Sequence, residues 1–149
     1  MNIGFLTSGG LAPCLSASIG ALIEAYSKKD LNTEFLGYIN GYSGLLKDKS
    51  YIFPNEIISD ISILYSYGGS IIGNSRIKLT NKEDCFRKGL IKKNENPLEK
   101  AASVLIKNKV DILHTIGGDD TNTMASELSL FLEKSGYQLT VVGLPKTID

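Results

Sequence analysis

Glycine pairs, carboxylates and a lysine stand directly after three short apolar runs of this 149-residue chain. They form the segments Ser8-Gly9-Gly10, Gly117-Gly118-Asp119-Asp120 and Pro145 to Asp149. Adjacent carboxylates repel phosphate unless a cation lies between them, and Mg²⁺ is held by one or two carboxylates together with phosphate oxygens. The Asp119–Asp120 pair therefore predicts a magnesium and phosphate site. The alternative is that an aspartate only caps the helix that follows.

The Gly9-Gly10 pair lets the backbone approach a ligand without a Cβ atom in the way. We expect a helix to follow it, and a helix N-terminus offers unpaired N–H groups and the positive end of a dipole. These features suit an anion such as phosphate; the alternative is a plain turn between strand and helix. The chain contains neither a Walker A nor a G-x-G-x-x-G pattern, which argues against a P-loop NTPase and a dinucleotide-dependent enzyme.

Lys146 and Asp149 follow Asp119 by about one strand–helix–strand unit. A carboxylate near a hydroxyl can act as a general base, and a lysine can neutralise charge on a transferring phosphoryl group. The alternative is a polar loop without chemistry. Arg76 follows a second glycine-rich segment, Gly68 to Gly73, and is a candidate phosphate ligand. A lone arginine is otherwise a surface residue.

Two residues that often carry chemistry are assigned to packing instead. His114 lies within an apolar run and is expected to be a hydrogen-bonded core residue. Cys14 opens the first helix and is expected to be a small packed residue rather than a reactive thiol. Two cysteines in all are too few for a disulfide framework, so we expect reduced thiols and a cytoplasmic protein.

The elements that must position these residues alternate between strands and helices. Apolar runs predict strands at 3–6, 35–39, 51–53, 110–116 and 139–143, with helices after Pro13 and over 56–64, 82–88, 97–108 and 122–134. Helical crossovers make the main strands parallel. We therefore predict an α/β fold of three Rossmann-like layers, with a parallel sheet covered on both faces. Ligands of such sheets bind beyond the carboxyl ends of the strands, where the three segments would meet.

Composition narrows the function classes. The chain has 42% hydrophobic residues, enough for one domain with a core. Sixteen basic residues balance sixteen acidic ones, which argues against nucleic acid or an anionic membrane as a partner. Only two of the cations are arginine, so a phosphate site must rely on backbone N–H groups, lysine or metal. No apolar run approaches the roughly 18 residues of a membrane span, and the first residues lack the basic region of a signal peptide.

Four separated motifs resemble those of the phosphofructokinase family, in the same order along the chain. They are 6–16 (LTSGGLAPCLS), 68–76 (GGS through SR), 117–123 (GGDDTNT) and 145–149 (PKTID). Within that family, Asp120 and Lys146 are similar to residues of the pyrophosphate-dependent branch, whereas ATP-dependent members typically have glycine at both places. Leu11 and Cys14 depart from the GGDAPG form that is usual in ATP-dependent members.

The resemblance implies phosphoryl transfer from pyrophosphate to the 1-hydroxyl of fructose 6-phosphate, the glycolytic step that gives fructose 1,6-bisphosphate, with Mg²⁺ as cofactor. Gly10 would hydrogen-bond the donor phosphates, and Arg76 would bind their oxygens. Asp119 would hold Mg²⁺. Asp120 would add bulk and negative charge where the α-phosphate of a nucleotide would lie, which disfavours ATP. Transfer of this kind depends mostly on positioning and charge stabilisation.

On the acceptor side, the resemblance implies that Lys146 contacts the transferring phosphate and that Thr147 helps to hold the sugar or phosphate near it. Asp149 would be the base that takes the proton of the sugar hydroxyl. The residues that grip the sugar phosphate in the family lie beyond this point. Residues 1–149 are therefore interpreted as the N-terminal, donor-binding part of a phosphofructokinase domain, without its C-terminal sugar-phosphate-binding part. For the full-length form the resemblance implies a homo-oligomer. We expect weak donor and metal binding, and no turnover by this chain alone.

Three alternatives stay open. One is an ATP-dependent phosphofructokinase with an unusual donor loop. Another is a related NAD or lipid kinase, in which Gly-Gly-Asp loops also occur but the Pro-Lys-Thr-Ile-Asp segment is not expected. The third is a non-catalytic α/β module that binds phosphate or a sugar phosphate.

Overall fold

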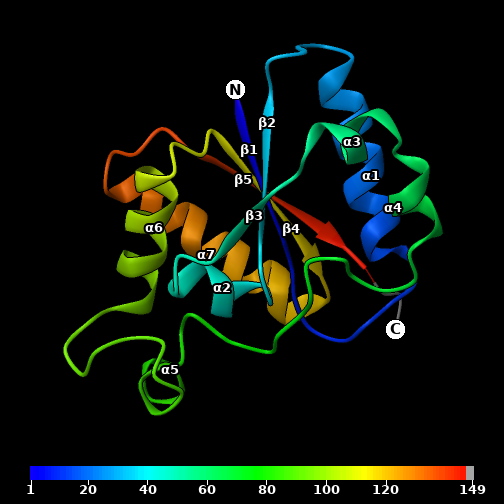
Figure 1. Ribbon diagram of the computed structural model, residues 1–149. Helices are drawn as coiled ribbons and strands as arrows, with labels where there is room; N and C mark the ends of the chain where they lie inside the picture. Colours follow the sequence, from blue (N-terminus) through cyan, green and yellow to red (C-terminus); the bar gives the residue numbers. More distant parts are fainter. Residues whose placement is uncertain (147–149) are drawn as a thin grey trace.

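A five-stranded sheet organises the computed structural model, which describes residues 1–146 (Figure 1). The strands are β1 (Asn2–Thr7), β2 (Glu34–Tyr38), β3 (Ser50–Ile52), β4 (Ile112–Gly117) and β5 (Thr140–Pro145), in the spatial order β3-β2-β1-β4-β5. All neighbours pair in parallel except β2 and β3, which are antiparallel. The short connection between β2 and β3 explains the exception, because a parallel crossover needs a dozen or more residues. The expected α/β fold is confirmed.

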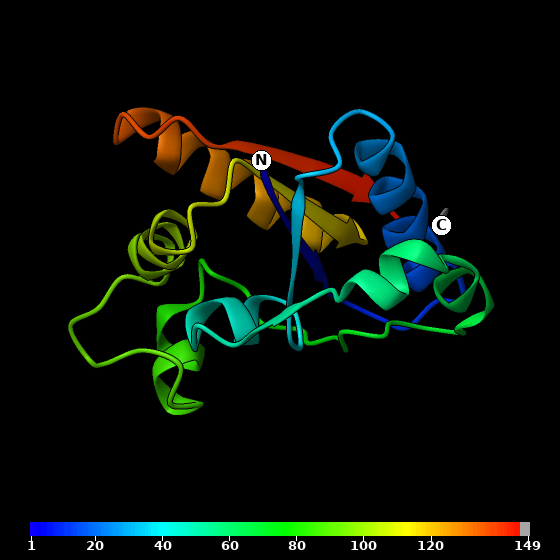
Figure 2. The same ribbon diagram turned by 45° about the horizontal axis from the view of Figure 1, so that its top comes forward.

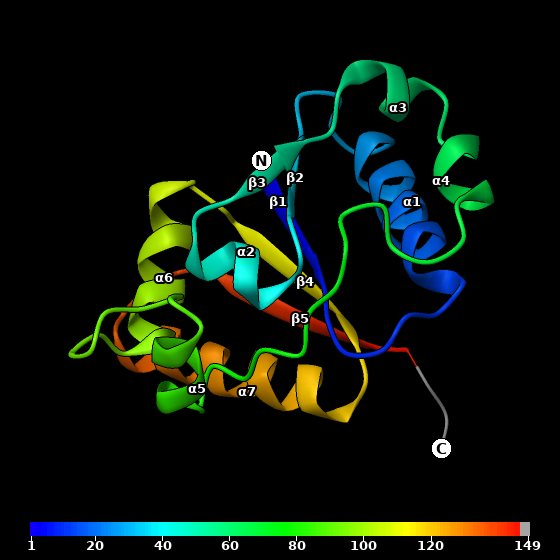
Figure 3. The same ribbon diagram turned by 60° about the horizontal axis from the view of Figure 1, so that its bottom comes forward.

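Helices cover both faces of this sheet, as Figures 1 and 3 show. One face carries α1 (Cys14–Ser27), α3 (Asn55–Ser59) and α4 (Ser62–Ser66), and the other carries α2 (Tyr42–Leu46), α5 (Lys82–Arg87), α6 (Pro97–Lys107) and α7 (Asp119–Lys134). The sheet is thus the middle of three layers. None of the helices within residues 1–146 is long and apolar enough to cross a lipid bilayer.

Strand β1 shows how one short segment fills both cores. Ile3 and Phe5 are fully buried in the cluster that includes Ile19 and Ile23 of α1. Leu6 belongs to the cluster on the opposite face, with the buried side chains of α6 and α7. Successive side chains of a strand point to opposite faces, so β1 is held from both sides. The loop at its carboxyl end therefore starts from a rigid support.

The carboxyl ends of the parallel strands lie at one edge of the sheet, and Figure 2 shows the arrowheads of β4 and β5 pointing the same way. Helix α6 follows the sequence prediction closely, because the Asn96 side chain accepts a hydrogen bond from the Leu98 N–H at 2.9 Å and Pro97 occupies the first helical position. The strand that follows α6 is β4, which leads directly to Gly117 and Gly118.

Two helices differ from the prediction. Helix α7 begins at Asp119 rather than near Asn122, with Gly118 as its N-cap. The two aspartates therefore form the first helical turn, where carboxylates meet the positive end of the helix dipole. The helix predicted over 56–64 is divided into α3 and α4 at Asp60, which accepts a hydrogen bond from the Ser62 hydroxyl. Local side-chain bonds of this kind compete with helix.

Candidate functional site

A cavity of about 640 Å³ opens at the carboxyl ends of β1, β4 and β5. Four segments that are far apart in the sequence line it. The lining residues are Ser8, Gly9, Gly10, Arg76, Ile77, Lys78, Gly118, Asp119, Asp120, Thr121 and Lys146. Five of the predicted site residues are therefore brought together, namely Gly10, Arg76, Asp119, Asp120 and Lys146. Thr147 and Asp149 lie outside the described residues.

The first loop of the cavity is fastened to the second glycine-rich segment. The Thr7 hydroxyl lies 2.6 Å from the Ser70 hydroxyl and donates to the Gly73 carbonyl at 2.9 Å. One residue later, the Ser8 hydroxyl and the Gly9 N–H both donate to the Ser75 carbonyl, at 2.7 and 2.9 Å. These bonds fix the segment that ends at Ser75 beside the first loop, and so they bring the next residue, Arg76, to the cavity.

Gly10 lies next to two cations of the cavity. A Cβ atom built on Gly10 would lie 3.4 Å from the Lys146 Nζ and 4.0 Å from the Arg76 Nη2. The Lys146 ammonium also donates to the Gly10 carbonyl, and the Lys146 N–H donates to the Gly117 carbonyl at 2.9 Å. Lys146 therefore links the loop after β1 with the loop after β4.

The helix that presents its N-terminus to the cavity is α7. Gly118, Asp119, Asp120 and Thr121 line the cavity, whereas no residue of α1 does so. The sequence predicts an anion site at the start of the helix after Gly9-Gly10 as well, but the cavity is lined by the loop before α1 and not by α1 itself. In α1 the Ser16 N–H instead donates to the Gly69 carbonyl at 2.9 Å, so the start of that helix holds the second glycine-rich segment.

Lys78 is a cavity residue that the sequence argument missed. Its ammonium lies 3.0 Å from a carboxylate oxygen of Asp120, and both side chains are largely exposed. Exposed ion pairs of this kind contribute little to stability, so the pair matters for charge rather than for folding. Among the described lining residues, three cations then face two carboxylates. No local pattern marked Lys78, because its partner lies in a distant part of the chain.

The carboxylates suit a magnesium ion that is shared with a phosphate ligand. Asp119 is exposed at the cavity and forms no ion pair within residues 1–146. The same residues contain no group of three His, Cys, Asp or Glu side chains that could hold a metal. A site that supplies one or two carboxylates and leaves the other positions to water and phosphate oxygens is typical of Mg²⁺. The residues present therefore fit this ion together with a phosphate ligand.

His114 and Cys14 differ in part from the prediction. His114 is buried, stacks on Phe5 with ring centroids 5.8 Å apart, and its Nε2 lies 3.0 Å from the Tyr26 hydroxyl. Its buried Nδ1 has no hydrogen-bond partner among the described residues, so only one of the two ring nitrogens is hydrogen-bonded. Burial lowers the pKa of His114. Cys14 is exposed rather than packed, because α1 buries the face that carries Leu15 and Ile19.

Known proteins are similar to this chain in sequence and in fold. Residues 2–149 match the family model described as phosphofructokinase. Over 148 residues, or 99% of this chain, the sequence is 53% identical to the pyrophosphate–fructose 6-phosphate 1-phosphotransferase of Methylomonas methanica, of which it covers 36%. It is 35% identical to the ATP-dependent 6-phosphofructokinase of Entamoeba histolytica, over 99% of this chain and 30% of that protein.

A solved structure has the same fold. The crystal structure of a pyrophosphate-dependent phosphofructokinase from Nitrosospira multiformis superimposes with a TM-score of 0.79 at 22% identity, over 99% of this chain and 34% of that one. The chain thus spans about a third of the length of the relatives it matches. With a family model that matches nearly all of its residues, the chain belongs to the phosphofructokinase family.

Proposed function

We propose that residues 1–149 supply the donor-binding part of a site that transfers a phosphoryl group from pyrophosphate to the 1-hydroxyl of fructose 6-phosphate. The observation that carries this proposal is the convergence of Gly10, Arg76, Asp119 and Lys146 on one cavity from four separate segments. Phosphoryl transfer depends on positioning and on neutralising charge. A diphosphate in this cavity would meet a glycine backbone, cations and a metal-binding carboxylate.

Each lining residue has a role in this proposal. Arg76 binds donor oxygens, with a guanidinium fork that suits phosphate. Lys146 contacts the transferring phosphate and stabilises the charge that it gains. Asp119 would hold Mg²⁺, which, when bound, neutralises and orients the diphosphate oxygens. Asp149, outside the described residues, remains the predicted base for the sugar hydroxyl, and Thr147 its predicted neighbour.

Pyrophosphate is favoured over ATP as the donor. The pyrophosphate-dependent relative from Methylomonas methanica is 53% identical to this chain, whereas the ATP-dependent relative from Entamoeba histolytica is 35% identical. The structure adds a physical reason, because Asp120 stands at the cavity with its carboxylate paired to Lys78. A nucleotide would have to place a further charged phosphate or its sugar beside that carboxylate. A diphosphate would not.

The test is a comparison of donors in equilibrium titrations with Mg²⁺ present. Pyrophosphate should bind the unchanged chain at least tenfold more tightly than ATP. The double variant Asp120→Gly/Lys146→Gly should lose this preference, because it removes both the Asp120 carboxylate and the Lys146 ammonium. Equal binding of the two donors by the unchanged chain, or an unchanged ratio in the variant, would contradict the assignment of these residues.

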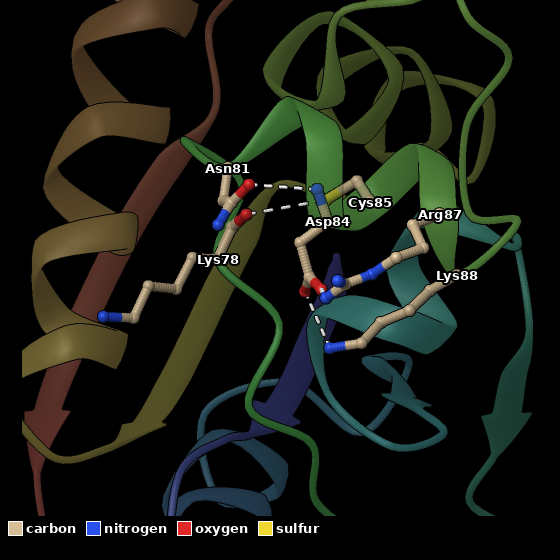
Figure 4. Close-up of polar contacts among 6 residues, drawn as sticks. All are labelled: Lys78, Asn81, Asp84, Cys85, Arg87 and Lys88. Atoms are coloured by element: carbon tan, nitrogen blue, oxygen red, sulfur yellow. Dashed lines mark hydrogen bonds and ion pairs between the residues drawn. The ribbon is translucent and has the colours of Figure 1, made fainter.

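A matched control uses a carboxylate outside the cavity. Asp84 pairs with Arg87 and Lys88 at 2.7 Å on the surface of α5, as Figure 4 shows. The variant Asp84→Asn removes a paired carboxylate, as the change at Asp120 does, but it leaves the cavity intact. It should therefore keep the donor preference of the unchanged chain.

A further inference from the structure

Two asparagine side chains hold the two glycine pairs of the cavity in the same way. The Asn74 Nδ2 donates to the carbonyls of Gly9 and Gly10, at 3.3 and 3.1 Å. The Asn122 Nδ2 donates to the carbonyls of Gly117 and Gly118, at 3.1 and 3.2 Å. Each carboxamide thus bridges two successive carbonyl groups of one loop. Neither asparagine lines the cavity itself.

The orientation of both carboxamides follows from hydrogen-bond chemistry. A backbone carbonyl only accepts, so the nitrogen of the carboxamide must face it. The opposite orientation would set the Oδ1 atom against two other oxygens. The Oδ1 atoms of Asn74 and Asn122 are buried and have no partner within residues 1–146. The only hydrogen bonds of these two side chains within the described residues are therefore the ones that their Nδ2 atoms donate to the glycine carbonyls.

Fixing a carbonyl also fixes the N–H on the other edge of the same peptide. In a planar trans peptide, the C=O of one residue and the N–H of the next point in opposite directions. Holding the Gly9 carbonyl therefore directs the Gly10 N–H away from Asn74, and holding the Gly117 carbonyl directs the Gly118 N–H away from Asn122. Within the described chain neither N–H donates to another residue.

The two loops so fixed stand next to each other. A Cβ atom built on Gly9 would lie 3.9 Å from the backbone nitrogen of Gly118, and both glycines line the cavity. We propose that Asn74 and Asn122 are positioning residues, which hold the N–H groups of Gly10 and Gly118 ready for oxygen atoms of one phosphate group. This inference rests on the proposed function, because that function supplies the phosphate.

Asparagine-to-aspartate variants test the inference, because a carboxylate keeps the shape and loses the donor. In titrations with inorganic pyrophosphate and Mg²⁺, Asn74→Asp and Asn122→Asp should each bind at least tenfold more weakly than the unchanged chain. The bond that each variant should lose on binding is the one from a glycine N–H to a charged phosphate oxygen, and a hydrogen bond to a charged group corresponds to at least that factor. Asn74→Ala and Asn122→Ala serve if a carboxylate beside two carbonyls prevents folding.

Matched controls come from asparagines that accept instead of donating. The Asn81 side chain accepts from the Asp84 N–H at 3.0 Å, as drawn in Figure 4, and Asn96 accepts from the Leu98 N–H at 2.9 Å. Asn81→Asp and Asn96→Asp keep these caps. They should bind pyrophosphate like the unchanged chain.

Amide NMR separates positioning from a general structural effect. In the unchanged chain, pyrophosphate should shift the amide resonances of Gly10 and Gly118. The shift of Gly10 should disappear in the Asn74 variants and that of Gly118 in the Asn122 variants, while thermal unfolding shows both to be folded. Folded variants with unchanged affinity and unchanged shifts would overturn the inference alone. No binding of pyrophosphate by the unchanged chain would overturn the proposed function, and with it the role of the two asparagines.

Discussion

Replacing Gly10 by alanine tests whether the donor phosphates approach the backbone at the first loop. Gly10 does not have a positive φ, so alanine fits its backbone conformation. The new Cβ atom would lie 3.4 Å from the Lys146 Nζ and 4.0 Å from the Arg76 Nη2, which are ordinary contacts. The variant should therefore fold with unchanged stability, and its methyl group should occupy the space between two cations where a phosphate oxygen is expected.

The size of the effect follows from the bonds that the methyl group would prevent. A hydrogen bond to a charged group contributes about 1.5–3 kcal/mol, so the dissociation constant of Mg²⁺-pyrophosphate should rise roughly 10- to 100-fold. Gly9→Ala is the contrasting variant. Gly9 has a φ of 85°, a conformation that costs an alanine about 1–2 kcal/mol. It should lose stability, which Gly10→Ala should not.

Two measurements on the same samples decide between these effects. Urea unfolding gives the stability of each variant, and pyrophosphate titration with Mg²⁺ gives the affinity. Stable Gly10→Ala protein that binds pyrophosphate as tightly as the unchanged chain would refute the placement of the donor beside Gly10. A loss of stability in Gly10→Ala would instead refute the expectation that an alanine fits the backbone conformation at position 10.

Three further perturbations have defined outcomes. Burial lowers the pKa of His114, the only histidine of the chain, so the unfolded state binds a proton at a higher pH than the folded state does. The free energy of unfolding should therefore fall as the pH drops below about 6.5. Urea titrations between pH 7.5 and 5.5 measure this slope, and His114→Phe should remove it. Gly89 has a φ of 65° with open space around it, so Gly89→Ala should lower the free energy of unfolding by about 1–2 kcal/mol. Gly41 has a φ of 62°, and a Cβ atom built on it would also lie 2.5 Å from a backbone oxygen of β1. Gly41→Ala should therefore cost at least ~1 kcal/mol more than Gly89→Ala when the midpoints of urea unfolding are compared. Lys78→Met should weaken pyrophosphate binding severalfold in a titration, because it leaves Asp120 unpaired at the cavity.

The parallel core of the fold was predictable because its signals are local. Apolar runs marked the strands, and Asn96-Pro97 marked the start of α6, where the expected cap is present. The convergence of Gly10 and Asp119 followed from topology alone, since parallel strands end at the same edge of a sheet. Arg76 joined them through bonds between Ser75 and the first loop.

The missing details depend on contacts that no local pattern records. Asn74 bonds to carbonyls more than 60 residues earlier in the chain, and Lys78 pairs with Asp120 on a different element. The start of α7 was misplaced because Gly118 serves as its N-cap without a side-chain hydrogen bond. Serine, threonine, aspartate and asparagine caps are the ones that sequence reasoning finds most easily.

A crystal structure of this chain grown with Mn²⁺ and pyrophosphate would test the central claim most directly, because Mn²⁺ replaces Mg²⁺ and is located by its anomalous scattering. We predict a diphosphate in the cavity, in contact with Arg76 and Lys146, and a metal peak bound to the Asp119 carboxylate and to diphosphate oxygens. A diphosphate bound elsewhere, or a metal that does not touch Asp119, would contradict the account.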